Sequence, residues 1–138
     1  MKKKGSICEF NIARDEAILG AYRRHADMCD HIRLVDMAEK VAATPCGRFY
    51  VSEERAKAVV SQLIKGNDAT AGMNESKRRM FSEIHRRVAR LRRDRPRSSL
   101  SALVSEVVNS PAPEMYLSPR YIYDRLITII NSRIKSRR

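Results

Sequence analysis

A dense run of arginine between Ser76 and Arg97 is the part of this sequence best suited to a chemical role. These 22 residues, SKRRMFSEIHRRVARLRRDRPR, hold ten Lys or Arg against two acids, Glu83 and Asp94. A guanidinium group is planar and always charged, and it can bind a phosphate group through two parallel hydrogen bonds. The chemistry indicated is therefore the binding of phosphates, and such a basic stretch is typical of nucleic-acid-binding proteins.

An amphipathic helix would hold these arginines in a row. With successive side chains about 100° apart, apolar residues fall on one arc of the helix and arginines on the opposite arc. The apolar set is Met80, Phe81, Ile84, Val88 and Leu91, and the opposite arc holds Arg79, Arg86, Arg90 and Arg93. Together with Arg87, these four arginines form the predicted phosphate-binding set. The alternative is a solvated face stabilised by ion pairs four residues apart, such as Glu75–Arg79, Glu83–Arg87 and Arg90–Asp94.

Length and charge restrict the classes of protein to consider. The 138 residues suit one compact domain or two very small ones. The formal net charge is +12, of which residues 1–66 carry +3 and residues 67–138 carry +9. Attraction to a membrane surface is a rival explanation of such charge, but no stretch approaches the ~18 apolar residues of a spanning helix. The basic N-terminus has no apolar segment after it, so we expect a cytoplasmic protein without membrane association.

Neither metal binding nor catalysis is indicated. The three cysteines, Cys8, Cys29 and Cys46, are odd in number and form no CxxC motif, which favours reduced thiols. His25, Cys29 and His31 lie close together in the sequence, but they match no known zinc spacing. The sequence has no glycine-rich phosphate loop, no carboxylates at metal spacing and no nucleophile elbow. We therefore expect no cofactor, no metal and no enzymatic activity.

Apolar periodicity predicts an all-α fold with six helices. They are expected at about residues 10–27, 32–43, 52–65, 76–94 and 118–135, with the counterpart of 32–43 beginning at about residue 98. Ser52 and Ser118 are predicted N-caps, and Pro119 occupies the favoured first helical position. The polar stretch 66–74, GNDATAGMN, is the clearest linker.

The second half of the chain is similar to the first when residue numbers are shifted by 66. Residues 40–64 align without a gap on residues 106–130. The matched pairs include Pro45 with Pro111, Tyr50 with Tyr116 and Ser52 with Ser118. We interpret this as an internal repeat of a three-helix unit, with units at 9–66 and 75–138 that pack together as one compact body.

The order of helix, helix, break and helix resembles that of helix-turn-helix DNA-binding domains. The resemblance covers most of the chain and implies that a third helix could enter a major groove. Two features depart from the family pattern. The segments 44–51 and 110–117 are longer than the usual turn of three or four residues, and GNDATAG does not look like the strands of a wing.

The helix predicted at 118–135 has a mixed polar face that suits base recognition. The face comprises Arg120, Tyr121, Asp124, Arg125, Thr128 and Asn131, of which Arg120, Tyr121, Arg125 and Thr128 are the predicted nucleic-acid-binding residues. On this helix Arg125 would contact guanine, while Tyr121 and Thr128 suit phosphates or a thymine methyl group. The alternative is an ordinary amphipathic helix whose polar face is simply solvated.

These observations favour a non-catalytic nucleic-acid-binding protein that acts as a small regulator or accessory factor. Duplex DNA is the favoured ligand, and structured RNA is an alternative, because arginine-rich helices bind RNA too. Another alternative is a helical interaction module in which the arginine row contacts an acidic protein partner. The sequence leaves the oligomeric state open.

Overall fold

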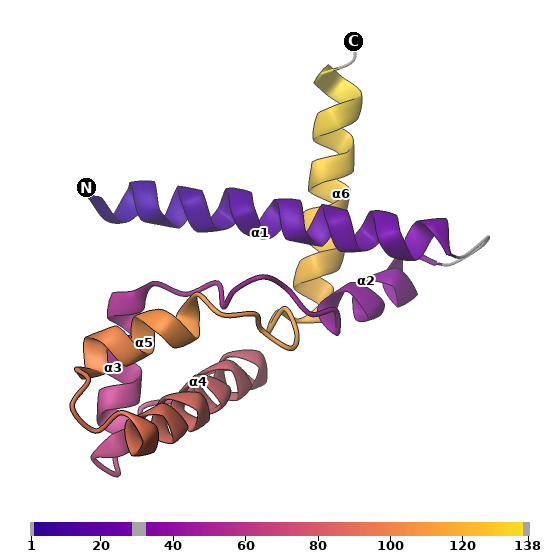
Figure 1. The fold of residues 1–138 in the computed structure, drawn as a ribbon. Helices are drawn as coiled ribbons and strands as arrows, with labels where there is room; N and C mark the ends of the chain where they lie inside the picture. Colours follow the sequence, from indigo (N-terminus) through magenta and orange to yellow (C-terminus); the bar gives the residue numbers. More distant parts are fainter. Residues whose placement is uncertain (1, 29–32, 137–138) are drawn as a thin grey trace. The chain divides into compact units, whose positions relative to one another are not determined.

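The computed structural model describes the backbone of residues 2–28 and 33–136 and the side chains of residues 11–28 and 33–132 (Figure 1). Every regular element assigned in this part of the chain is an α-helix, and no strand is assigned there, which agrees with the predicted all-α fold. They are α1 (Lys2–Asp27), α2 (Leu34–Ala42), α3 (Glu53–Ile64), α4 (Glu75–Asp94), α5 (Leu100–Val108) and α6 (Pro119–Ser136). None of these helices is long and apolar enough to cross a membrane.

Serine side chains begin both predicted capped helices. The Oγ of Ser52 accepts a hydrogen bond from the backbone N–H of Arg55 at 3.1 Å. The Oγ of Ser118 accepts one from the N–H of Tyr121, also at 3.1 Å. Each bond satisfies a donor that the first turn of a helix leaves without a partner, so these two predictions are confirmed.

The helices form two packing units that do not follow the order of the chain. Unit 1 comprises Met1–Cys46 and Pro113–Arg138, and it contains α1, α2 and α6. Unit 2 comprises Gly47–Ala112, and it contains α3, α4 and α5. The tandem units predicted at 9–66 and 75–138 are not confirmed, because each packing unit takes its third helix from the other half of the sequence.

Local structure nevertheless follows the 66-residue offset. Helices α2 and α5 begin and end 66 residues apart, and α3 and α6 begin 66 residues apart. In unit 2 the N–H of Phe49 donates to the carbonyl of Val108 at 3.0 Å. In unit 1 the N–H of Met115 donates to the carbonyl of Ala42 at 3.1 Å, and these residues again differ by 66. The first bond ties the segment before α3 to the end of α5, and the second ties the segment before α6 to the end of α2. In both cases the two partners come from different halves of the sequence.

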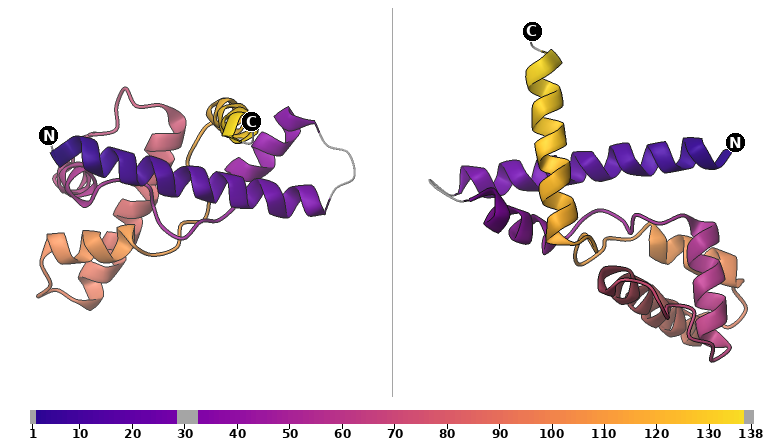
Figure 2. Two further views of the ribbon diagram at one scale, coloured as in Figure 1. Left: turned by 90° about the horizontal axis from the view of Figure 1, so that it is seen from above. Right: turned by 180° about the vertical axis from the view of Figure 1, so that it is seen from behind.

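Unit 1 is built where α6 crosses α1 and α2 (Figures 1 and 2). Its core residues are Ile18, Ala21, Met37, Ala38, Val41, Met115, Ile122 and Leu126. Beside this core, the guanidinium of Arg125 forms two hydrogen bonds with the carboxylate of Asp15 on α1. Arg14 donates to the hydroxyl of Tyr121, and its guanidinium lies 5.0 Å from the centre of the tyrosine ring. Polar pairs between α1 and α6 thus accompany the apolar packing.

Unit 2 buries the apolar face of α4 against α3 and α5. Met80, Phe81, Ile84 and Val88 are buried as predicted, whereas Leu91 is only partly covered. Phe49, which precedes α3, is also fully buried. The core of this unit therefore fixes the rotation of α4 about its axis and determines which of its side chains reach the solvent.

The cap of α6 gives a test of the fold. We expect Ser118→Ala to lower the free energy of unfolding by about 1 kcal/mol, because the N–H of Tyr121 loses its acceptor. Urea unfolding followed by circular dichroism measures the change. Ser101→Ala is the control, since Ser101 is an exposed residue inside α5. Equal stability of the Ser118→Ala variant and the wild type would contradict the cap.

Candidate nucleic-acid interface

The face of α4 opposite the core carries the arginine row. Arg79, Arg86, Arg90 and Arg93 are all exposed. They belong to a unit that is basic as a whole, because residues 47–112 contain 14 Lys or Arg and 7 Asp or Glu. The row lies on a helix whose first turn is capped by Asn74, which accepts from the N–H of Lys77 at 2.9 Å. A regular, well-anchored helix therefore presents these side chains to solvent.

Glu83 divides this row into arginines with different surroundings. Arg86 donates to both oxygens of Glu83, at 3.1 and 2.6 Å, and Arg87 donates to Oε2 at 2.7 Å. The hydrogen bond from Arg86, supported by the one from Arg87, lowers the pKa of the Glu83 carboxyl against the opposing effect of partial burial. Glu83 is thus ionised at neutral pH, and it offsets part of the positive charge of its two neighbours.

Arg87 has a structural role that the sequence did not indicate. Its side chain is half-buried, and Nη1 donates to the carbonyl of Pro111 at 2.8 Å and to the Oγ of Ser110 at 3.2 Å. The guanidinium also lies 5.1 Å from the centre of the Phe49 ring. Arg87 thereby connects α4 to the segment before α3 and to the segment after α5. The available signal was its position on the helix, since Arg87 falls at the edge of the apolar arc.

The last turns of α4 hold the least neutralised positive charge. The side chains of Arg90, Arg92 and Arg93 are exposed, and none forms an ion pair or hydrogen bond with another described residue. The ion pair between Arg90 and Asp94 that the sequence allowed is not formed in this part of the chain. These three guanidinium groups therefore keep all their donors available for a ligand.

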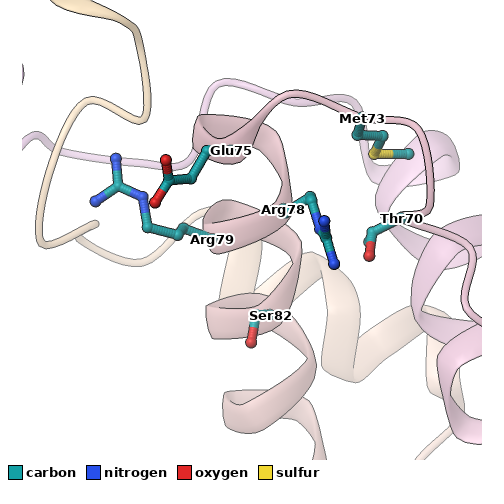
Figure 3. Close-up of a pocket in the computed structure, with 6 residues that line it drawn as sticks. All are labelled: Thr70, Met73, Glu75, Arg78, Arg79 and Ser82. Atoms are coloured by element: carbon teal, nitrogen blue, oxygen red, sulfur yellow. The ribbon is translucent and has the colours of Figure 1, made fainter.

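Two hollows lie along α4. The smaller, of about 340 Å³, is lined by Ala89, Arg92, Arg93 and Pro96. The larger, of about 560 Å³, is lined by Thr70, Met73, Glu75, Arg78, Arg79 and Ser82 (Figure 3). In each hollow a small residue of the helix, Ala89 or Ser82, lies beside a pair of adjacent arginines. The surface is thus indented where its charge is dense.

The residues predicted to recognise bases lie on α6, in unit 1 rather than unit 2. The bonds of Arg125 with Asp15 raise the pKa of this guanidinium and occupy part of its donor fork. Arg120 lies 3.5 Å from Asp124 in an exposed ion pair, and the hydroxyl of Thr128 donates to the carbonyl of Asp124 at 2.9 Å. The hydroxyl of Tyr121 accepts a hydrogen bond from Arg14. Each of the four residues predicted to bind nucleic acid on α6 therefore already has a polar partner within unit 1.

Candidate metal ligands are not gathered in the described part of the chain. It contains no group of three or more His, Cys, Asp or Glu placed to hold a metal ion. Cys8, Cys29 and His31 lie outside the residues whose side chains are described. The ring Nε2 of His25 lies 2.9 Å from the Oγ1 of Thr44, which itself lies 2.7 Å from the carbonyl of Lys40. Because that hydroxyl proton goes to the carbonyl, Nε2 of His25 is the donor in this contact.

Two arginines of α4 separate structural from ligand-facing roles. We expect Arg87→Ala to lower the free energy of unfolding by about 2 kcal/mol, because several hydrogen bonds to a charged group and a ring contact are lost. Arg90→Ala removes the same charge from an exposed position and should change stability by less than about 0.5 kcal/mol. Urea unfolding of both variants provides the measurement. Equal losses would contradict the structural role of Arg87.

Comparisons with known proteins add no family to this description. The chain matches no protein-family model, and neither the curated proteins nor the solved structures contain a significant match to it.

Proposed function

We propose that this protein binds nucleic acid through the exposed face of α4, without catalysis, as a small regulator or accessory factor in the cytoplasm. Duplex DNA is the favoured ligand. The observation that carries the proposal is the group formed by Arg90, Arg92 and Arg93, whose guanidinium groups are exposed and have no partner among the described residues. Such groups can each neutralise a phosphate without first breaking an internal ion pair.

The energetics of phosphate binding support this assignment. A cation that neutralises a phosphate releases condensed counterions, so binding gains free energy that depends steeply on salt. Three unpaired arginines within one helical turn are arranged for several such contacts. By contrast, Arg86 would have to share its donors with Glu83. We therefore assign the main phosphate contacts to the C-terminal half of α4.

The chemistry of this face also bears on the alternative of an acidic protein partner. Protein interfaces are enriched in aromatic, Met and Arg side chains, and of these the exposed arc of α4 offers only Arg. The exposed arc of α4 carries small residues between its charged ones, such as Ser82 and Ala89, and none of the exposed large hydrophobic residues lies on α4. A charged polymer is a better match for such a surface than a folded partner with an apolar centre.

Salt dependence gives the direct test. We expect Arg90→Ala and Arg93→Ala each to weaken binding to any duplex and to lower the salt slope of the affinity by about one unit. Fluorescence anisotropy with a labelled random-sequence duplex over a salt series measures both effects. Lys57→Ala is a matched control, because it removes an exposed charge of unit 2 from α3 rather than α4.

The outcomes of this titration separate the alternatives. Tighter binding to a structured RNA than to the duplex would favour the RNA alternative. If neither nucleic acid binds the wild-type protein at low salt, the proposal fails and the acidic-partner alternative is favoured. An equal effect of Lys57→Ala and Arg93→Ala on the salt slope would show that net charge, rather than the face of α4, determines binding.

Base recognition by α6 remains a prediction, and Asp15 offers a way to test it. We expect Arg125→Ala and Asp15→Asn to lower the free energy of unfolding alike, by about 1–2 kcal/mol, because each breaks the same charged pair. Thermal unfolding measures this loss. If Arg125 also contacts a base, only Arg125→Ala should reduce the preference for a selected sequence over a random one.

A further inference from the structure

We propose that the larger hollow, at the start of α4, recognises the edge of a G·C base pair. The inference rests on the proposed function and deepens it, because it assigns sequence recognition to particular side chains of the same helix. The smaller hollow, near the end of α4, would then hold only phosphate.

The lining of the larger hollow combines hydrogen-bond donors and acceptors with one apolar side chain, that of Met73. Arg78 extends toward Thr70 on one side, and Glu75 lies beside Arg79 on the other, with Ser82 below them on the helix (Figure 3). Thr70 is buried, and its hydroxyl donates to the Oδ1 of Asp68 at 2.9 Å. Because this proton is used, the Thr70 hydroxyl could only accept a hydrogen bond from a ligand in the hollow.

This mixture suits a base edge better than a phosphate. The Glu75 carboxylate would repel a phosphate, whereas it can accept a hydrogen bond from the exocyclic amino group of cytosine. Arg78 can donate to the O6 and N7 atoms of guanine, which lie next to that amino group in the major groove. A G·C pair presents two adjacent acceptors followed by the amino donor, whereas an A·T pair places its amino donor between two acceptors. The G·C pair is therefore the occupant to which a neighbouring Arg and Glu commit the lining.

The smaller hollow contains no such combination. Ala89 and Pro96 are apolar, and Arg92 and Arg93 supply donors alone. Ser82 and Ala89 are seven residues apart, so the two hollows lie about 10 Å apart along the helix at 1.5 Å per residue. That separation corresponds to about three base-pair steps of 3.4 Å. One helix lying along a duplex could therefore contact a base pair at one end and the backbone at the other.

Variants at the two hollows test this assignment in the full-length protein. Duplexes are first selected from a random pool, and the affinity ratio between a selected duplex and its G·C-to-A·T variant is then measured by anisotropy. We expect Arg78→Ala and Glu75→Gln each to reduce this ratio by about five- to a hundredfold. Arg92→Ala is the matched control, because it should weaken both duplexes equally and leave the ratio unchanged.

Failure of this inference can be distinguished from failure of the proposed function. If duplex DNA binds but no sequence is preferred, or if Arg78→Ala leaves the ratio unchanged, the base-recognition role is overturned and phosphate binding by α4 stands. A ratio lowered by Arg92→Ala as much as by Arg78→Ala would overturn the division between the hollows. If no nucleic acid binds, both proposals fall. Circular dichroism of each variant verifies that its helices are intact.

Discussion

Burial of the apolar face of α4 is the constraint on which the candidate interface depends. Phe81, Ile84 and Val88 can leave water only by packing against α3 and α5, and this packing fixes the rotation of the helix. Once the rotation is fixed, the arginines on the opposite arc must point outward. Their exposure is therefore a consequence of core packing, and at Arg90 and Arg93 it leaves the guanidinium donors available to a ligand.

Electrostatic pairing then differentiates residues that look alike in the sequence. Glu83 is one turn from both Arg86 and Arg87, and it draws both into hydrogen bonds. Beyond that carboxylate, Arg90 has only Asp94 within helical reach and does not pair with it, and Arg93 has no acid three or four residues away on the helix. A single acid on the helix thus divides a continuous basic run into an engaged half and an available half. This division makes the end of α4 the better place for phosphate and leaves the mixed lining near its start for discrimination.

Local features were predictable from the sequence because they depend on neighbours along the chain. The caps at Ser52 and Ser118, the approximate bounds of α2 to α6 and the buried face of α4 follow from residue type and periodicity over a few turns. The predicted start of the first helix at about residue 10 was wrong, because α1 already begins at Lys2, in a basic stretch without apolar periodicity. The role of Arg87 was not predictable, because its contacts with Pro111 and Phe49 come from distant segments. The packing partner of each helix was not predictable either. Periodicity identifies the apolar face of a helix, but it does not say which other apolar face covers it. The same limitation applies to Arg125, whose acidic partner lies 110 residues away in the sequence.

The grouping of the helices has a consequence for a chain cut between α3 and α4. A protease acting in the stretch 66–74 would leave one fragment with α1, α2 and α3 and another with α4, α5 and α6. Neither fragment would contain a complete core, because unit 1 needs α6 and unit 2 needs α3. Each fragment alone would expose the apolar residues that its missing helices cover. The two pieces should consequently stay together after cleavage as a noncovalent complex, and when made separately they should fold only upon mixing.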